Sequence, residues 1–393
     1  MRFPTYLYSE VRGVGETLLG CGLPANLYLP SPKWSRSMNV AQRPCGSLIQ
    51  GTLPVGCVQC TEGAKMVLFV TGLCSFHCFY CPVSDEKMYK DVVFADEKRV
   101  ETDADVIEEA RAIRAKGAGI TGGDPLEAAD RTAHYIRILK EEFGPAFHTH
   151  LYTMSTDPEK IRKLADAGLD EIRFHVPPGL WSRPEALGFP AAVRLSKELG
   201  MTVGLEVPLI PERKADLVRL IEWAEAERLA FVNLDEMEYS DANFARMKVR
   251  GYEVKHELAY GVKGADEVAR QLLERGWKTT VHYCTSGYND AWQLRTRIKR
   301  RAENVARPWD VVTDDGTLVK GIIEGDGLDD LLRDLAKHHR VPKKLMGLDA
   351  ARKRIEIAPW VLEEIAPRLG RPSFVVEEYP TADGLEVERI RLP

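Results

Sequence analysis

Three cysteines lie within one short stretch of the chain and are suited to metal binding. Cys74, Cys78 and Cys81 form a C-x3-C-x2-C pattern that directly follows the apolar run 66–70. Three thiolates on one loop can bind three irons of a [4Fe–4S] cluster and leave the fourth iron open to a substrate or cofactor. A zinc knuckle is the alternative, but zinc prefers paired Cys-x2-Cys or Cys/His ligands. The tight loop, with Tyr80 just before its last cysteine, favours the cluster.

The remaining cysteines suggest a second metal centre. Seven of the eight cysteines lie in the first 81 residues, and only Cys284 lies elsewhere. Cys57 and Cys60 form a C-x2-C pair that needs further ligands, which Cys45 and Cys284 could supply, with Cys21 as another candidate. A second [4Fe–4S] cluster, or a single iron or zinc held by four thiolates, fits this set. The alternative is that these residues are structural thiols near the first cluster.

The cysteine loop makes the family recognisable. Over roughly residues 60–285 the chain resembles the radical S-adenosylmethionine (radical SAM) superfamily, and within it an uncharacterised, mainly archaeal group related to the activating enzymes of glycyl radical enzymes such as pyruvate formate-lyase. The resemblance implies that the open iron chelates SAM. One electron from the reduced cluster, supplied by a ferredoxin- or flavodoxin-type donor, then cleaves SAM to methionine and a 5′-deoxyadenosyl radical. That radical abstracts hydrogen from an unactivated C–H bond.

The ends of later strands supply positions that the resemblance assigns to cofactor binding. The segment 120–125, Ile-Thr-Gly-Gly-Asp-Pro, would alone be an ordinary turn, but it resembles the family's Gly-Gly-Glu-Pro motif, whose glycine backbone contacts the SAM amino group. Aspartate here replaces the usual glutamate and has a shorter reach. For His175 and Glu206 a purely structural role is the alternative. The cofactor-binding set comprises Tyr80, Gly122, Gly123, Asp124, Ser155, His175 and Glu206.

The strand predicted at 231–236 carries the candidate catalytic residues. Alternation places Asn233 and Asp235 on one face, and Glu236 and Glu238 on the other. Polar groups at the end of a barrel strand are typical of catalytic or substrate-binding residues. We therefore predict Asn233, Glu236 and Glu238 as catalytic, with N-caps of the following helix as the alternative.

These residues must be positioned by alternating strands and helices, which begin near residue 66. We predict strands at 66–71, 118–121, 147–153, 171–176, 202–208, 231–236 and 279–283, separated by amphipathic helices. This pattern predicts an α/β fold, a partial (β/α)6-type TIM barrel whose chemistry lies at the carboxyl ends of the strands. The predicted divisions are an irregular Cys-rich segment 1–62, a barrel 63–290, and a basic helix with a small α+β appendage 291–393.

Composition sets the remaining limits. The chain has 393 residues, 44% hydrophobic and 29% charged, and a net charge of −5, which gives no global bias toward nucleic acid or anionic membranes. No apolar stretch approaches the length that spans a bilayer, and the first ten residues contain no apolar core of a signal peptide. We expect a cytoplasmic protein.

Several functions fit this sequence. The favoured one is a radical SAM enzyme that acts on a small metabolite or cofactor precursor. A tRNA-modifying enzyme is an alternative because residues 295–307 are rich in arginine, although such a helix is more often a solvated face. Activation of a glycyl radical enzyme is a third, and a non-enzymatic iron–sulfur electron carrier or zinc-stabilised binding module is a fourth. The last leaves the Gly-Gly-Asp-Pro segment unexplained.

Overall fold

A computed structural model describes residues 40–256 and 259–393, which form two compact units. The first unit contains the described residues up to Ile107 and the segment Lys116–Leu294. The second contains Glu108–Ala115 and Arg295–Pro393. The boundaries predicted after residues 62 and 290 stay predictions.

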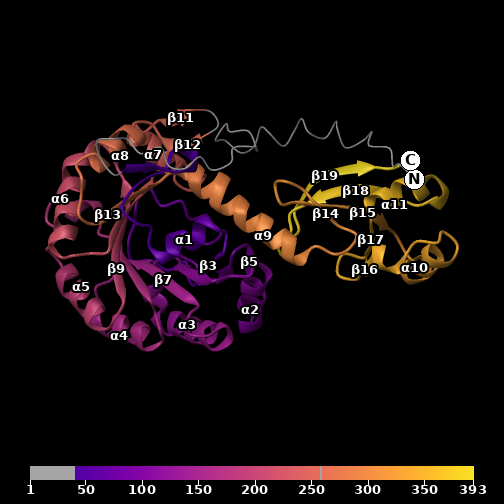
Figure 1. The fold of residues 1–393 in the computed structure, drawn as a ribbon, viewed down its shortest axis with the longest axis horizontal. Helices are drawn as coiled ribbons and strands as arrows, with labels where there is room; N and C mark the ends of the chain where they lie inside the picture. Colours follow the sequence, from indigo (N-terminus) through magenta and orange to yellow (C-terminus); the bar gives the residue numbers. More distant parts are fainter. Residues whose placement is uncertain (1–39, 257–258) are drawn as a thin grey trace. The chain divides into compact units, whose positions relative to one another are not determined.

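The first unit is built on a curved sheet of parallel strands (Figure 1). The order in the sheet is β13, β10, β9, β8, β7, β6 and β3, and each neighbouring pair is parallel. Each lies within two residues of a predicted strand. Their bounds are β3 Lys65–Phe69, β6 Gly117–Thr121, β7 His148–Thr153, β8 Glu171–Phe174, β9 Thr202–Leu209, β10 Phe231–Glu236 and β13 Thr280–Cys284.

The sheet does not close on itself. Beyond β13 it continues with β2 (Leu48–Gln50) and β1 (Val40–Gln42), and beyond β3 with β4 (Phe94–Ala95) and β5 (Lys98–Arg99), all antiparallel to their neighbours. A twisted parallel sheet with two separate edges is a partial barrel. The predicted α/β fold of the partial TIM-barrel type is confirmed.

Helices cover the outer face of this sheet because one residue in two along each strand is apolar. Leu68, Ile120, Leu151, Ile172 and Leu205 are fully buried on that side. Burying each such side chain is worth about 1.5–3 kcal/mol. The helices after β3 are α2 Asp103–Ala112, α3 Ala129–Phe143, α4 Pro158–Asp166, α5 Phe189–Glu198, α6 Lys214–Ala226, α7 Phe244–Val249 and α8 Ala265–Leu273. A short hairpin, β11 Val254–His256 and β12 Ala259–Val262, precedes α8.

The opposite, inner face is covered in part by the segment that begins at residue 40. The sequence predicts little regular structure there, yet residues 40–61 form β1, β2 and helix α1 (Val55–Thr61). Helix α1 contacts β3, β6 and β7. Its Gly56 lies against the side chains of His150 and Arg173, where a Cβ would collide with both. Glycine therefore lets α1 approach the inner wall of the barrel. Cys21 lies outside the described residues.

A π-helical turn and a long helix follow the last barrel strand. The sequence predicts one helix over 290–304. The structure has a π-helix at Tyr288–Leu294 and then α9 at Arg295–Val305. Single π-turns occur frequently at functional sites.

The second unit is an α+β structure, as predicted. Its antiparallel sheet has the order β16, β17, β15, β18, β19, with β14 paired to β15. Helices α10 and α11 share an apolar core with this sheet around Ile323, Leu335 and Ile357. The elements are β14 Val311–Val312, β15 Leu318–Glu324, α10 Leu328–Lys337, β16 Met346–Asp349, β17 Arg354–Ile357, α11 Pro359–Leu369, β18 Ser373–Glu378 and β19 Glu386–Arg391.

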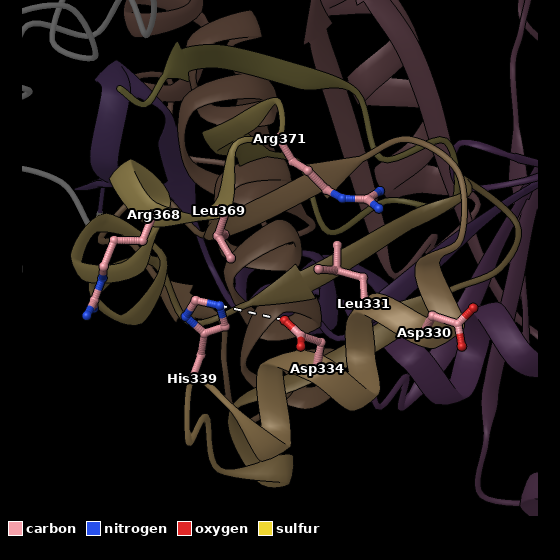
Figure 2. A pocket seen from close by; sticks show the side chains of 7 residues that line it. All are labelled: Asp330, Leu331, Asp334, His339, Arg368, Leu369 and Arg371. Carbon is pink, nitrogen blue, oxygen red and sulfur yellow. Dashed lines mark ion pairs between the residues drawn. The ribbon is translucent and has the colours of Figure 1, made fainter.

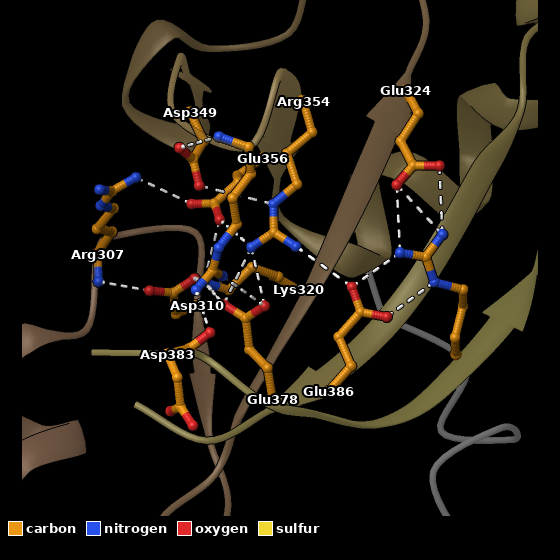
Figure 3. A network of polar contacts seen from close by, with 12 residues as sticks. Arg307, Asp310, Lys320, Glu324, Asp349, Arg354, Glu356, Glu378, Asp383 and Glu386 are labelled. Carbon is orange, nitrogen blue, oxygen red and sulfur yellow. Dashed lines mark hydrogen bonds and ion pairs between the residues drawn. The ribbon is translucent and has the colours of Figure 1, made fainter. Parts of the chain in front are cut away.

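Charged side chains of the second unit form a buried network (Figure 3). Lys320 Nζ lies 2.7 Å from Glu378, 3.3 Å from Glu356 and 3.4 Å from Asp310. Arg354 bridges the same two glutamates at 2.7 and 2.8 Å. These five side chains are all at least nine-tenths buried, so their charges depend on one another.

Candidate functional site

The cysteine loop is held against the Gly-Gly-Asp-Pro segment by backbone hydrogen bonds. The N–H of Gly123 donates to the carbonyl of Thr71 at 2.8 Å, and the N–H of Asp124 donates to Leu73 at 2.9 Å. A Cβ at Gly122 would collide with the Thr71 carbonyl oxygen, and one at Gly123 with that of Leu73. The glycines are therefore required where these two chain segments meet.

Asp124 is buried, and its side chain connects the Gly-Gly-Asp-Pro segment to the end of β7. Its carboxylate accepts hydrogen bonds from Leu126 N–H (3.0 Å), Thr153 Oγ1 (2.7 Å) and Met154 N–H (2.9 Å). Burial nevertheless raises the pKa of this carboxyl. The same contacts place Ser155 beside the end of β7, where its N–H donates to Thr153 Oγ1 at 2.9 Å.

Cys74, Cys78 and Cys81 are all partly exposed on this loop. The N–H of Phe76 donates to Cys74 Sγ at 3.4 Å, and Arg246 and Asn243 donate to the carbonyls of Cys81 and Tyr80 at 3.3 and 3.0 Å. Burial raises the pKa of the Cys74 thiol to about 11. A thiol loses its proton when it binds a metal cation such as iron. Soft thiol ligands on one anchored loop, with an amide donor to sulfur, fit an iron–sulfur cluster.

Tyr80 and His175 bring the loop and strand β8 together. The Tyr80 hydroxyl lies 2.8 Å from His175 Nε2. Burial lowers the pKa of His175 to about 4 and raises that of Tyr80, so both groups are neutral near pH 7. The phenol then donates and the imidazole accepts, with the ring proton on Nδ1.

The inner face of the barrel carries a polar group centred on Glu206. Arg173 Nη1 and Asn233 Nδ2 donate to its carboxylate at 2.5 and 3.1 Å. Asp235 forms a side-chain hydrogen bond with the same carboxylate, and burial together with the charge of Glu206 raises the pKa of Asp235 well above its usual range. Asp235 is therefore the proton donor of this carboxyl pair. Arg173 also pairs with Glu171 at 2.5 Å.

Glu236 and Glu238 lie apart from that group. Glu236 is bound by Lys255 at 2.5 Å and by Ser286, whose N–H and hydroxyl donate at 3.0 and 3.1 Å. Burial and the nearby carboxylates of Asp290 and Glu236 raise the pKa of Glu238 to about 7. Their assignment as catalytic, like that of Asn233, stays a prediction.

The additional thiols gather at the same inner wall. Cys57 Sγ lies 3.2 Å from Asn233 Nδ2 and 3.6 Å from Arg173 Nη2. Cys284 ends β13 opposite Asp235, and Gln293 Nε2 of the π-helix approaches its Sγ at 4.0 Å. Among the described residues, no three Cys, His, Asp or Glu side chains are arranged around a single metal ion.

An open pocket of about 400 Å³ lies in the second unit (Figure 2). His339 pairs with Asp334 at 3.7 Å there, and Arg368 and Arg371 lie at its edge. The cysteines and the Gly-Gly-Asp-Pro segment belong to the first unit.

Sequence reasoning missed two members of the inner polar group. Arg173 and Asp235 are central in the structure, whereas neither was among the predicted site residues. Arg173 could have been predicted from the strand Glu171–Phe174. Glu171 and Arg173 are two residues apart, so both point to the same face of the strand, and charged side chains in a buried strand need partners there.

Two family profiles match parts of this chain. Residues 68–177 match the profile of the radical SAM superfamily, and residues 316–392 match a family described as a domain of unknown function, DUF8061. A protein of Methanocaldococcus jannaschii, whose name assigns it provisionally as a glycyl-radical enzyme activating enzyme, is 36% identical over 356 residues. The match covers 86% of this chain and 93% of that protein. In the part of the chain that the structure describes, no helix has the length and apolar character to cross a membrane.

Two solved structures align at low identity. SuiB of Streptococcus suis, bound to the precursor peptide SuiA, aligns with a TM-score of 0.36 and 12% identity, over 57% of this chain and 50% of SuiB. HydG, a maturase of the [FeFe]-hydrogenase, aligns with a TM-score of 0.37 and 14% identity, over 62% of this chain and 65% of HydG.

Proposed function

Because this chain belongs to the radical SAM superfamily, we propose that it removes a hydrogen atom from an unactivated C–H bond of a small polar molecule bound inside the barrel. It is an enzyme of the radical SAM type, and this class uses a [4Fe–4S] cluster and SAM. Together these cofactors supply a carbon radical that abstracts hydrogen. The protein must hold the reacting carbon in place and exclude water.

We assign the cluster to Cys74, Cys78 and Cys81. SAM is then bound by backbone groups of Gly122 and Gly123 and by the side chains of Ser155, Tyr80 on the cysteine loop, His175 after β8 and Glu206 on β9. Asp124 acts indirectly, because its carboxylate is already occupied by three hydrogen bonds that tie the Gly-Gly-Asp-Pro segment to the end of β7. An electron donor of the ferredoxin or flavodoxin type reduces the cluster.

The carboxyl pair of Glu206 and Asp235 is the observation that carries the small-molecule assignment. These groups lie on the inner face of β9 and β10, and the cysteine loop follows the carboxyl end of β3 in the same parallel sheet. Asp235 donates a hydrogen bond to Glu206, which also accepts one from Arg173. Such a group can orient a hydroxyl, amine or amide of a substrate. A polar wall of this kind inside a barrel suits a compact substrate better than a protein surface.

The test is production of 5′-deoxyadenosine from SAM under dithionite reduction. Cell extract is divided by ultrafiltration, and each fraction is added to the anaerobic holoenzyme. We expect the small-molecule fraction to stimulate production, and Cys78→Ala to abolish it. Asp235→Asn should lose the stimulation while retaining the slow production seen without substrate. Stimulation only by the retained macromolecules would contradict the small-molecule assignment.

A second candidate is activation of a glycyl radical enzyme, which the name of the Methanocaldococcus jannaschii relative favours. In that case a protein in the retained fraction is the substrate and acquires a stable glycyl radical, visible by EPR.

Transfer RNA is a less favoured substrate, because arginines of the basic helix α9 bind groups within the second unit. Arg300 donates to the carbonyl of Ile113 at 2.6 Å, and Arg301 pairs with Glu109.

A further inference from the structure

We propose that Cys45, Cys57, Cys60 and Cys284 bind a second [4Fe–4S] cluster on the inner wall of the barrel, separate from the cluster on Cys74, Cys78 and Cys81. The assignment does not depend on which substrate the enzyme uses. It rests on the positions of the four cysteines, on the groups that contact their sulfur atoms, and on the kind of metal group that four such thiols can bind.

Two of the thiols come from one face of α1. Cys57 and Cys60 are three residues apart in a helix, so their side chains lie on adjacent turns. Cys284 approaches them from the end of β13, where it is paired with Asp235 of β10. Cys57 Sγ accepts from Asn233, which precedes Asp235 by two residues on β10. Cys57 of α1 and Cys284 of β13 are therefore both placed beside the inner face of β10.

Cys45 is brought to the same place by an unusual backbone. It has a φ of 52°, a left-handed conformation that residues other than glycine seldom adopt. Its carbonyl accepts a hydrogen bond of 2.9 Å from Thr285 Oγ1, the residue next to Cys284. Its Cβ lies 3.5 Å from the position that a Cβ atom would occupy at Gly287. The turn thus holds a fourth cysteine beside the end of β13 at some cost in strain.

Donor groups surround the sulfurs. Cys57 Sγ receives an N–H of Asn233 at 3.2 Å and faces Arg173 at 3.6 Å. The side-chain amide of Gln293 approaches Cys284 Sγ at 4.0 Å. Hydrogen bonds and positive charge near cluster sulfurs stabilise the reduced state and raise the reduction potential.

The arrangement favours a cluster over a single ion. A lone zinc or iron requires its ligand atoms to meet around one point, with Zn–S bonds of about 2.3 Å. The four thiols come from three separate elements, the turn Pro44–Gly46, helix α1 and the end of β13. The irons of a cluster occupy separate corners, each with its own thiolate.

The first experiment removes that first cluster. The Cys74→Ala/Cys78→Ala/Cys81→Ala variant is purified anaerobically, and iron, zinc and sulfide are counted. We expect about four irons and four sulfides per chain, with an EPR signal after dithionite that SAM does not alter. A folded variant without iron overturns the proposal, and one zinc without sulfide shows a mononuclear site instead.

Single variants of the native enzyme keep the proposal testable if the triple variant does not fold. Cys57→Ser and Cys284→Ser should each lower the iron content from about eight to about four per chain while the SAM-sensitive signal persists. Asn233→Ala should keep all irons but lower the potential of the SAM-insensitive cluster, because its sulfur loses a donor. An iron content near four in the native enzyme, unchanged by Cys57→Ser, would overturn the assignment.

Discussion

Arg173 donates a 2.5 Å hydrogen bond to Glu206 inside the barrel, and its other nitrogens hold Glu171. Removing one member of a buried ion group leaves the others uncompensated. We therefore predict that Arg173→Met lowers the free energy of unfolding by about 3–5 kcal/mol. Urea denaturation under anaerobic conditions measures this change. The exposed Arg219→Met, on α6 of the same unit, is the control and should change stability by less than about 0.5 kcal/mol. Equal effects of the two variants would refute the buried-pair interpretation.

The raised pKa of Glu238 predicts a particular dependence of stability on pH. Its carboxyl titrates near 7 in the folded protein, against an ordinary value of 4.5. Between these values the folded state binds more protons than the unfolded state, so stability falls as pH rises from about 5 to 7. Over this pH range the free energy of unfolding of Glu238→Gln should therefore decrease by about 1–2 kcal/mol less than that of the native protein, with partial solvent screening taken into account. The thermal unfolding midpoints of both proteins are measured from pH 5.5 to 8. If the midpoints of the two proteins change in parallel with pH, Glu238 is not the group responsible.

The junction between the cysteine loop and the Gly-Gly-Asp-Pro segment predicts intolerance to side chains. In Gly123→Ala the new methyl group would press on the carbonyl oxygens of Leu73 and Gly72. We expect a loss of about 1–3 kcal/mol and weaker SAM binding, measured by calorimetry on the anaerobic protein. Gly179→Ala is the matched control, because nothing lies within 4 Å of its added carbon. Unchanged SAM affinity in Gly123→Ala would show that this contact is dispensable.

The charged network of the second unit predicts strong local destabilisation when one cation is removed. Lys320→Met leaves Asp310, Glu356 and Glu378 short of one positive charge in a buried place. We expect about 3–5 kcal/mol less protection of the β15 amides in hydrogen exchange. Arg333→Met, which breaks an exposed pair with Asp330, should cost at most about 1 kcal/mol. Similar protection in both variants would mean that the buried network contributes little.

The parallel strands could be predicted closely because their sequences alternate strongly. In β8 and β13 polar residues alternate with apolar ones, which gives both the strand and its two faces. The short strands β16 and β17 have four residues each and no turn signal strong enough to separate them from loop. Their pairing depends on β15, which no local pattern reveals.

The candidate site could be predicted only where the motif is local. The cysteine loop and the Gly-Gly-Asp-Pro segment are recognised from short stretches, and the structure places them side by side. The position of α1 inside the barrel, and the approach of Cys45 to residue 285 across 240 positions, result from tertiary packing. Arg173 was missed for the same reason, because two of its partners, Glu206 and Cys57, lie on other elements, β9 and α1.

The pairing of β2 with β13 also constrains how the chain is made. Ser47 reaches His282 and Tyr283, 235 and 236 positions further along. At the usual speed of protein synthesis, roughly ten seconds or more separate the appearance of these two strands. During that interval one side of β2 has no native partner, and an exposed strand edge can pair with other chains. The nascent chain is therefore most prone to aggregation before the ribosome has completed β13.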